Sequence, residues 1–193
     1  MPRTVRPLLF LFLLPLLLCA AACNGEKKSV QQTLERIMAS EITLPSEIEE
    51  ICGGEGHMLP DSVRTAEKLL YFVDSLQCST CQISKFVRFG EIMRKADSTG
   101  RFELMFLVSP KKGEKEFIRD YIKSIEMPFP ICVDLDNAFK RINPAIPDDV
   151  RFHCLYLDAE GRPLLAGDPT VSENISALLD KIIFNNPTNN QSL

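Results

Sequence analysis

The chain lacks any surplus of positive charge. Among its 193 residues, 22 lysines and arginines stand against 26 aspartates and glutamates, which gives a formal net charge of −4. Proteins that bind nucleic acid need a basic surface to neutralise phosphates. The sequence contains no cluster of lysines and arginines that would form one. We therefore expect no nucleic-acid partner.

Histidine is scarce and tryptophan is absent, with two residues of the first type and none of the second. A structural zinc site needs four ligands, so the closely spaced pair Cys78 and Cys81 would need two more. The remaining candidate ligands form no second closely spaced pair; they are Cys52, His57, His153 and Cys154. We expect neither a metal nor another cofactor, and metal binding at the close pair remains the weaker alternative.

The sequence also lacks an apolar run long enough to be read as a membrane-spanning helix. The run from Leu8 to Leu18 is broken by Pro15, whereas a spanning helix needs about 20 apolar residues. Because Arg3 and Arg6 precede it and three alanines follow it, we interpret residues 1–22 as a signal peptide. The sequence therefore predicts export.

The alanines directly before Cys23 resemble the cleavage box of bacterial lipoproteins, in which the cysteine becomes the lipidated first residue. We expect lipidation of Cys23, the alternative being ordinary cleavage to a soluble periplasmic form. Residues 23–64 are then a lipid-anchored tether and N-terminal arm. The protein would face the periplasm or be associated with the outer membrane.

The rest of the chain is long enough for one domain with a sizeable core, which we place at residues 65–184, followed by a disordered tail at 185–193. Residues 24–193 contain five cysteines, an odd number, whereas a pure disulfide scaffold favours an even count. Besides the close pair they are Cys52, which we leave unassigned, Cys132, which lies between Ile131 and Val133 and is predicted to be buried, and Cys154.

Hydrophobic patterning predicts alternating strands and helices. A helix over 29–39 and turns over 41–60 precede the domain. Strands are expected at 68–74, 102–108 and around 131–133, helices at 82–95, 114–125, 137–141 and 171–184, and a hairpin over 152–166. This order, βαβαβ followed by ββα, predicts a thioredoxin-like three-layer α/β/α sandwich with a mixed sheet and a strand–helix insertion.

The close cysteine pair, Cys78-Ser79-Thr80-Cys81, lies between a buried strand and a helix. The i, i+3 spacing on a helix brings both sulfurs onto one face, within reach of a disulfide. A helix that begins at Cys78 stabilises a thiolate there, so we expect Cys78 to attack and Cys81 to resolve the mixed disulfide. A static disulfide is the alternative.

Residues 72–85 and 155–163 resemble TlpA-like thioredoxin-family proteins of the bacterial envelope, most closely the lipoproteins of Bacteroides-type bacteria. Residues 129–134, followed by Ala138-Phe139, fit the insertion of those proteins. The resemblance covers about residues 65 to 184. It implies an envelope thiol–disulfide oxidoreductase acting through Cys78 and Cys81 on protein thiols or disulfides, together with a redox partner protein.

The sequence departs from the family pattern at three places. Gln77-Cys78-Ser79-Thr80-Cys81 replaces the usual Trp-Cys-Gly-Pro-Cys, and Phe72 takes the position of a buried acid, with Asp74 nearer the loop. Arg151-Phe152-His153 occupies the place of a cis-proline. A non-proline cis bond costs about 2.5–4 kcal/mol, so we expect a differently shaped loop.

This alignment predicts that His153 and Cys154 lie beside the dithiol as candidate modulators. His153 would tune the Cys78 thiolate or relay protons, the alternative being an ordinary loop histidine. Cys154 would form an alternative disulfide, or be a small buried strand residue. Because of the departures, a second function stays open: a non-catalytic lipoprotein that uses a thioredoxin-like scaffold as a binding or assembly module.

Overall fold

A computed structural model describes residues 27–125 and 127–185. The predicted signal peptide, Cys23 and nearly all of the predicted tail lie outside these ranges. The described residues divide between Arg36 and Ile37 into two units. Residues 27–38 are helical, close to the predicted 29–39. No helix in the described ranges is both long and apolar enough to cross a membrane.

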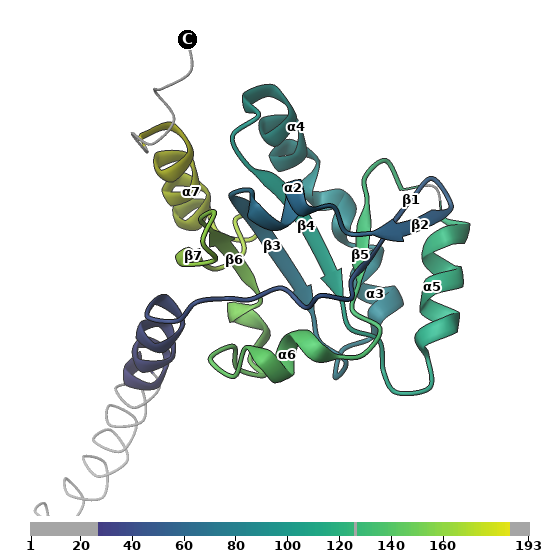
Figure 1. Cartoon of the computed structure of the whole chain (residues 1–193). Coiled ribbons are helices and arrows are strands. Elements are labelled where there is room, and N and C mark those ends of the chain that lie inside the picture. The colour runs from purple at the N-terminus through teal and green to yellow at the C-terminus, as the bar shows by residue number, and fades with distance from the viewer. Residues whose placement is uncertain (1–26, 126, 186–193) are drawn as a thin grey trace, which may run out of the picture. The chain divides into compact units, whose positions relative to one another are not determined.

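The second unit contains a mixed seven-stranded sheet with the order β2-β1-β5-β4-β3-β6-β7 (Figure 1). The strands are β1 (Glu49–Cys52), β2 (Glu55–Met58), β3 (Lys68–Val73), β4 (Glu103–Val108), β5 (Ile131–Val133), β6 (Cys154–Leu157) and β7 (Pro163–Ala166).

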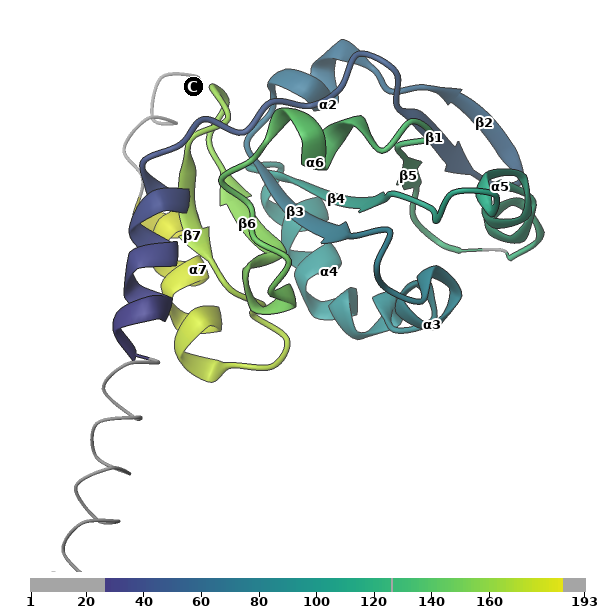
Figure 2. The same ribbon diagram turned by 90° about the horizontal axis from the view of Figure 1, so that it is seen from below.

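Helices lie on both faces of this sheet (Figure 2). They are α2 (Asp61–Thr65), α3 (Ser79–Ile83), α4 (Gly90–Thr99), α5 (Lys115–Ser124), α6 (Ala138–Ile142) and α7 (Glu173–Asn185), with 3₁₀ turns η1 (Phe86–Phe89) and η2 (Val150–Phe152). The main core cluster joins apolar residues of α3, η1, α4, α5 and α7 to one face. Figure 2 places α2 and α6 on the other face.

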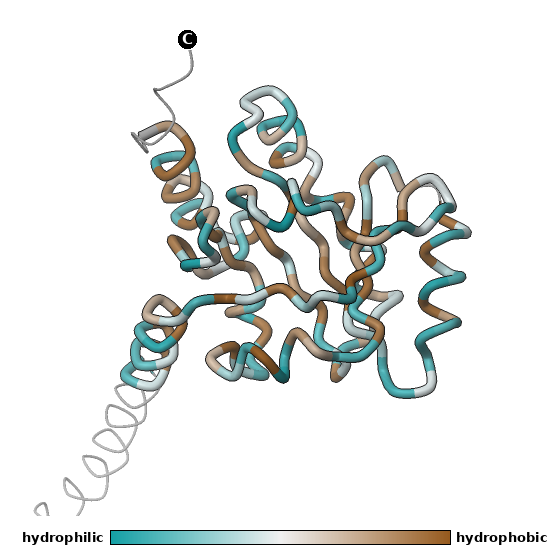
Figure 3. Tube along the Cα trace, viewed as in Figure 1, coloured by the Kyte–Doolittle hydropathy of each residue, from teal (hydrophilic) through white to brown (hydrophobic). Residues whose placement is uncertain are grey.

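The interior strand β3 is almost entirely buried, as expected of a strand covered on both faces. It pairs with β4 in parallel and with β6 antiparallel. Apolar residues run along the central strands, whereas polar and apolar residues alternate along α5 (Figure 3). The strand order and connections are those of a thioredoxin-like sandwich, and the insertion between β4 and β6 is α5, β5 and α6. The predicted fold class is confirmed.

The prediction of turns over residues 41–60 missed the hairpin β1–β2. β1 pairs antiparallel with β5, so this part of the predicted arm extends the sheet. The hairpin is short and mostly polar, with Ile51 as its buried apolar residue, and offers no alternating pattern. Gly53 and Gly54 form its turn with φ of 58° and 84°, angles that glycine adopts readily.

The single helix predicted over 82–95 is divided into α3, η1 and α4. Phe86 and Phe89 are both buried, and their rings lie 4.1 and 5.3 Å from that of Phe106, centroid to centroid. Residues three apart lie directly above one another in a 3₁₀ turn, which therefore brings both rings to the same β4 residue. Gly90 is the first residue of α4 rather than an interior glycine, and a Cβ there would meet only the Arg94 side chain, at 3.8 Å.

Candidate functional site

Cys78 and Cys81 form a disulfide just beyond the carboxyl end of β3, with their Cα atoms 5.3 Å apart. This separation lies in the usual range for a disulfide. The sequence prediction that the pair comes together on one helical turn is confirmed. Their roles as attacking and resolving sulfurs remain predictions.

Two donors surround the sulfur of Cys78. This residue is the N-cap of α3, and its Sγ accepts the backbone N–H of Cys81 at 3.4 Å. The Thr80 hydroxyl lies 3.6 Å from the same sulfur. Hydrogen bonds to the charged form of a thiol stabilise the thiolate. The site is therefore arranged to hold negative charge on Cys78 once the disulfide is reduced.

Cys78 and Cys81 are both exposed. Both residues are therefore accessible to solvent. Phe72, at the position of the family's buried acid, is instead 1% exposed and packs against Phe139 and His153 with centroid distances of 4.7 and 5.2 Å. An apolar ring at this position is compatible with an exposed second cysteine.

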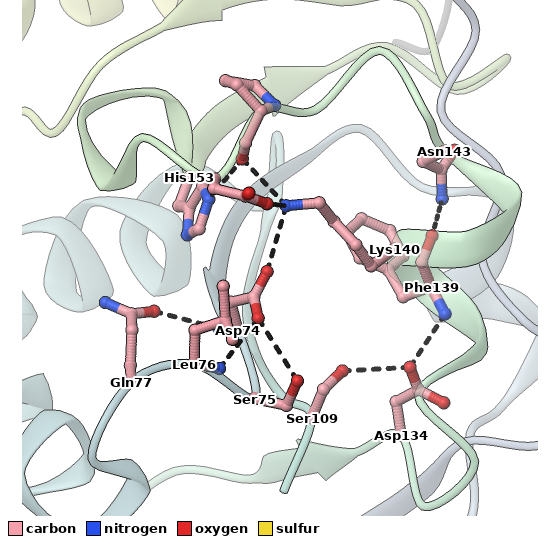
Figure 4. Close-up of polar contacts among 12 residues, drawn as sticks. Asp74, Ser75, Leu76, Gln77, Ser109, Asp134, Phe139, Lys140, Asn143 and His153 are labelled. Atoms are coloured by element: carbon pink, nitrogen blue, oxygen red, sulfur yellow. Dashed lines mark hydrogen bonds and ion pairs between the residues drawn. The ribbon is translucent and has the colours of Figure 1, made fainter. Parts of the chain in front are cut away.

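The loop that leads to the dithiol is organised by Asp74 (Figure 4). Asp74 Oδ1 accepts the N–H of Leu76 at 2.9 Å, and the Asp74 carbonyl accepts the N–H of Gln77 at 2.9 Å. The side chain of Gln77 returns to accept the N–H of Asp74, also at 2.9 Å. These bonds close a tight turn directly before Cys78.

The carboxylate of Asp74 is buried and meets Lys140 of α6. Burial alone raises the pKa of Asp74, but the Leu76 N–H and the Lys140 ammonium together lower it below its ordinary value. Lys140 Nζ lies 3.0 Å from Asp74 Oδ2, 3.0 Å from the Pro147 carbonyl and 2.8 Å from Asp148 Oδ1. One ammonium therefore joins three partners.

His153 is 2% exposed and lies against Phe72, whose ring also packs on Phe139 of α6. Burial lowers its pKa, and the nearby Lys140 adds to this effect. Its Nε2 donates to the Pro147 carbonyl at 2.9 Å, while Nδ1 is buried without a hydrogen-bond partner among the residues described. The His153 side chain thus contacts Phe72 and the Pro147 carbonyl. Its role as a modulator of the dithiol remains a prediction.

Cys154 is a free, fully buried thiol in β6, paired in register with Tyr71 of β3. Burial raises its pKa well above the ordinary value, so it is a protonated thiol. The Tyr71 hydroxyl accepts a hydrogen bond from Arg88 at 3.2 Å, and Arg88 forms an ion pair with Asp168. These contacts tie η1 to the loop after β7.

The other two free thiols differ in exposure. Cys132 is buried in β5, which confirms the prediction, and burial raises its pKa strongly. Cys52 is exposed at the end of β1. Within the described ranges, no group of three His, Cys, Asp or Glu side chains is placed to hold a metal ion.

The segment before β6 has its own shape. Residues Val150–Phe152 form the turn η2, capped by the Asp149 side chain, which accepts the N–H of Arg151 at 3.0 Å. All peptide bonds in the described ranges are trans. The structure thus places a capped 3₁₀ turn where the family pattern has a cis-proline.

Sequence reasoning missed Lys140, and no local signal identifies it. The residue lies on a short helix, 66 positions after its partner Asp74. In the sequence Lys140 resembles any charged residue on the solvent-exposed face of a helix. Only the packing of α6 beside the end of β3 makes it part of the site.

No protein-family model and no curated protein matches the sequence. Solved structures with similar coordinates include one from Chlorobium tepidum provisionally described as a thiol:disulfide interchange protein, DsbE, with 15% identity, a TM-score of 0.47, and coverage of 75% of this chain and 98% of that chain. Another is the exposed lipoprotein thioredoxin Etrx1 of Streptococcus pneumoniae, with 20% identity, a TM-score of 0.42, and coverage of 66% and 97%.

A third is an uncharacterized thioredoxin-like protein of Porphyromonas gingivalis, with 12% identity, a TM-score of 0.44, and coverage of 74% and 92%. At these values the assignment of the fold depends on the chain's own strand order. On that order the chain has a thioredoxin-like fold, with an exposed disulfide just beyond the carboxyl end of β3.

Proposed function

We propose that this protein is a thiol–disulfide oxidoreductase of the bacterial cell envelope, of the TlpA-like kind. The observation that carries the proposal is the exposed Cys78–Cys81 disulfide at the start of α3, with the Cys81 N–H and the Thr80 hydroxyl directed at the Cys78 sulfur. This is the arrangement that thiol–disulfide exchange needs: an accessible sulfur, a stabilised thiolate and a second cysteine within reach.

In the reduced protein, the Cys78 thiolate attacks one sulfur of a substrate disulfide. A Cys78–substrate bond forms, and the other substrate sulfur leaves as a thiolate that takes a proton from water. The Cys81 thiolate then attacks the Cys78 sulfur, which closes the intramolecular disulfide and releases the second substrate thiol. The substrate gains two electrons from the protein dithiol, and the reverse sequence oxidises a substrate dithiol.

The test is a trap for the mixed disulfide. A Cys81→Ser variant lacks the resolving sulfur, so it should accumulate a covalent, reductant-sensitive complex with a disulfide-containing protein or with oxidised glutathione. The matched control Cys78→Ser should form far less. If neither the wild type nor the trap variant exchanges with any small disulfide, the oxidoreductase proposal fails and the binding or assembly module becomes the better account.

We further propose that Cys23 anchors the protein to a membrane by an N-terminal lipid, on the basis of the small residues before it. Labelling of the full chain with a radioactive or alkyne fatty acid should mark the wild type but not a Cys23→Ala variant. Equal labelling of both would refute the anchor without bearing on the dithiol.

A further inference from the structure

Two loops meet where the end of β3 lies beside the start of β6. β3 and β6 are adjacent antiparallel strands, with Tyr71 paired to Cys154 and the Phe72 N–H bonded to the His153 carbonyl. The end of β3, which leads to the dithiol, therefore lies beside the start of β6. The loop after β3 begins with Asp74, and the segment before β6 contains Pro147 and Asp148.

Lys140 joins these two loops. Its ammonium lies 3.0 Å from Asp74 Oδ2 in the first, and 3.0 and 2.8 Å from the Pro147 carbonyl and Asp148 Oδ1 in the second. Figure 4 shows the ammonium at the centre of these three contacts. His153 donates to the same Pro147 carbonyl at 2.9 Å, which adds a bond from the start of β6.

The two acidic partners are unequal. The Asp74 side chain is 6% exposed, whereas that of Asp148 is 76% exposed. Exposed ion pairs contribute little, but removing one partner of a buried pair leaves an uncompensated charge. The charged groups that act on Asp74 are Lys140 and His153. Those that act on His153 are Lys140, Asp74 and Asp149.

We propose that Lys140 is a positioning residue for the dithiol: its contacts with Asp74, Pro147 and Asp148 hold the loop that carries Cys78 against the segment before β6. Lys140 would act on the dithiol through Asp74. The carboxylate of Asp74 accepts the Leu76 N–H and its backbone carbonyl accepts the Gln77 N–H, and Cys78 is the next residue. The inference rests on the proposed function to the extent that Cys78 is taken to be the reactive sulfur.

The first test measures the rate at which iodoacetamide labels Cys78 in the reduced full chain, from pH 5 to 9, with the labelled peptide identified by mass spectrometry. In Lys140→Met the loop loses its link to the segment before β6, so the Cys81 N–H and the Thr80 hydroxyl are held less firmly at the Cys78 sulfur and stabilise its thiolate less. We expect the profile to move to higher pH, with labelling at pH 6 slowed about threefold. Lys140→Arg keeps the charge and should follow the wild type.

Lys115→Met is the matched control, because it removes a lysine whose pair with Asp136, at 2.9 Å, lies on the exposed side of α5. It should leave the profile unchanged. Asp74→Asn breaks the same contact from its other end, so the double variant Lys140→Met/Asp74→Asn should shift the profile by less than the sum of the two single shifts. A Lys140→Met profile that matches the wild type, or a double-variant shift equal to the sum of the two single shifts, overturns the proposal.

The single variant Asp74→Asn tests the same contact if Lys140→Met fails to fold. It removes the ion pair with Lys140 but keeps an oxygen for the Leu76 N–H, so labelling at pH 6 should slow as it does in Lys140→Met. A profile unchanged by this substitution contradicts the proposal as well.

Amide hydrogen exchange gives a second readout that does not depend on cysteine reactivity. The N–H groups of Leu76 and Gln77 should exchange several times faster in Lys140→Met than in the wild type, while strand amides of β4 keep their rates. Unchanged exchange at both positions would refute a positioning role. Altered exchange in a protein that never reacts with disulfides would refute the proposed function alone.

Discussion

The hydroxyl of Thr80 lies 3.6 Å from the sulfur of Cys78, in the place where the family pattern has a proline between the two cysteines. A proline offers no hydrogen-bond donor, whereas threonine adds one next to the sulfur. The departure from the usual motif therefore gives the site a donor that the usual motif lacks.

Replacing Thr80 by valine should weaken the Cys78 thiolate. The variant keeps the shape of the side chain but loses the hydroxyl, and we expect iodoacetamide labelling of reduced Cys78 at pH 6 to slow about threefold to tenfold. Thr80→Ser, which keeps the hydroxyl, should stay close to the wild type. Equal rates for the valine and serine variants would show that the hydroxyl does not stabilise the thiolate.

The five cysteines of the described ranges should separate by reactivity. In the oxidised full chain, only exposed Cys52 among them should be alkylated, because Cys132 and Cys154 are buried and burial raises the pKa of both thiols. Mild reduction should add labelling at Cys78 and Cys81, both of which are exposed. Peptide mass spectrometry reads each site separately. A dithiol that stays unlabelled after mild reduction would favour the binding-module alternative.

His153 should make the protein less stable in mild acid. Burial lowers its pKa in the folded state from an ordinary value of 6.5, so the unfolded chain binds a proton more readily. Its contribution is therefore present above about pH 6.5 and is lost progressively as the pH falls toward the lower folded-state value, with a slope of at most about 1.4 kcal/mol per pH unit.

Urea unfolding at pH 7.5 and at pH 5 measures this contribution. His153→Phe, which keeps an aromatic ring against Phe72, should show a smaller loss of stability between the two pH values than the wild type. His57 is the chain's other histidine and is exposed, so His57→Phe should behave as the wild type does. If His153→Phe loses as much stability as the wild type, another group is responsible.

Phe72 should be a major contributor to stability. Its ring is 1% exposed and packs between Phe139 and His153, so Phe72→Ala should lower the free energy of unfolding by about 3–5 kcal/mol. Phe117→Ala on α5, where the side chain is 62% exposed, should change it by less than about 0.5 kcal/mol. Denaturant midpoints distinguish the two, and similar losses in both variants would contradict the assigned core.

The sequence by itself determined the order of the strands from β3 onward and the place of the dithiol. Continuous apolar runs such as that of β3 predict buried strands, and the spacing of Cys78 and Cys81 on a first helical turn brings their sulfurs together. Apolar flanks also predicted the burial of Cys132. These features depend on residues close together along the chain, so local patterns are sufficient.

Only the tertiary structure decided what surrounds the dithiol. The hairpin β1–β2 joins the sheet through its pairing with β5, and Lys140 meets Asp74 across 66 positions of sequence. Cys81 is exposed while Ile83, two residues later in α3, is buried in the core. Such contacts form between segments that are remote in the chain, where a short polar strand or a single lysine leaves no periodic signal, so they become visible only once the sheet is assembled.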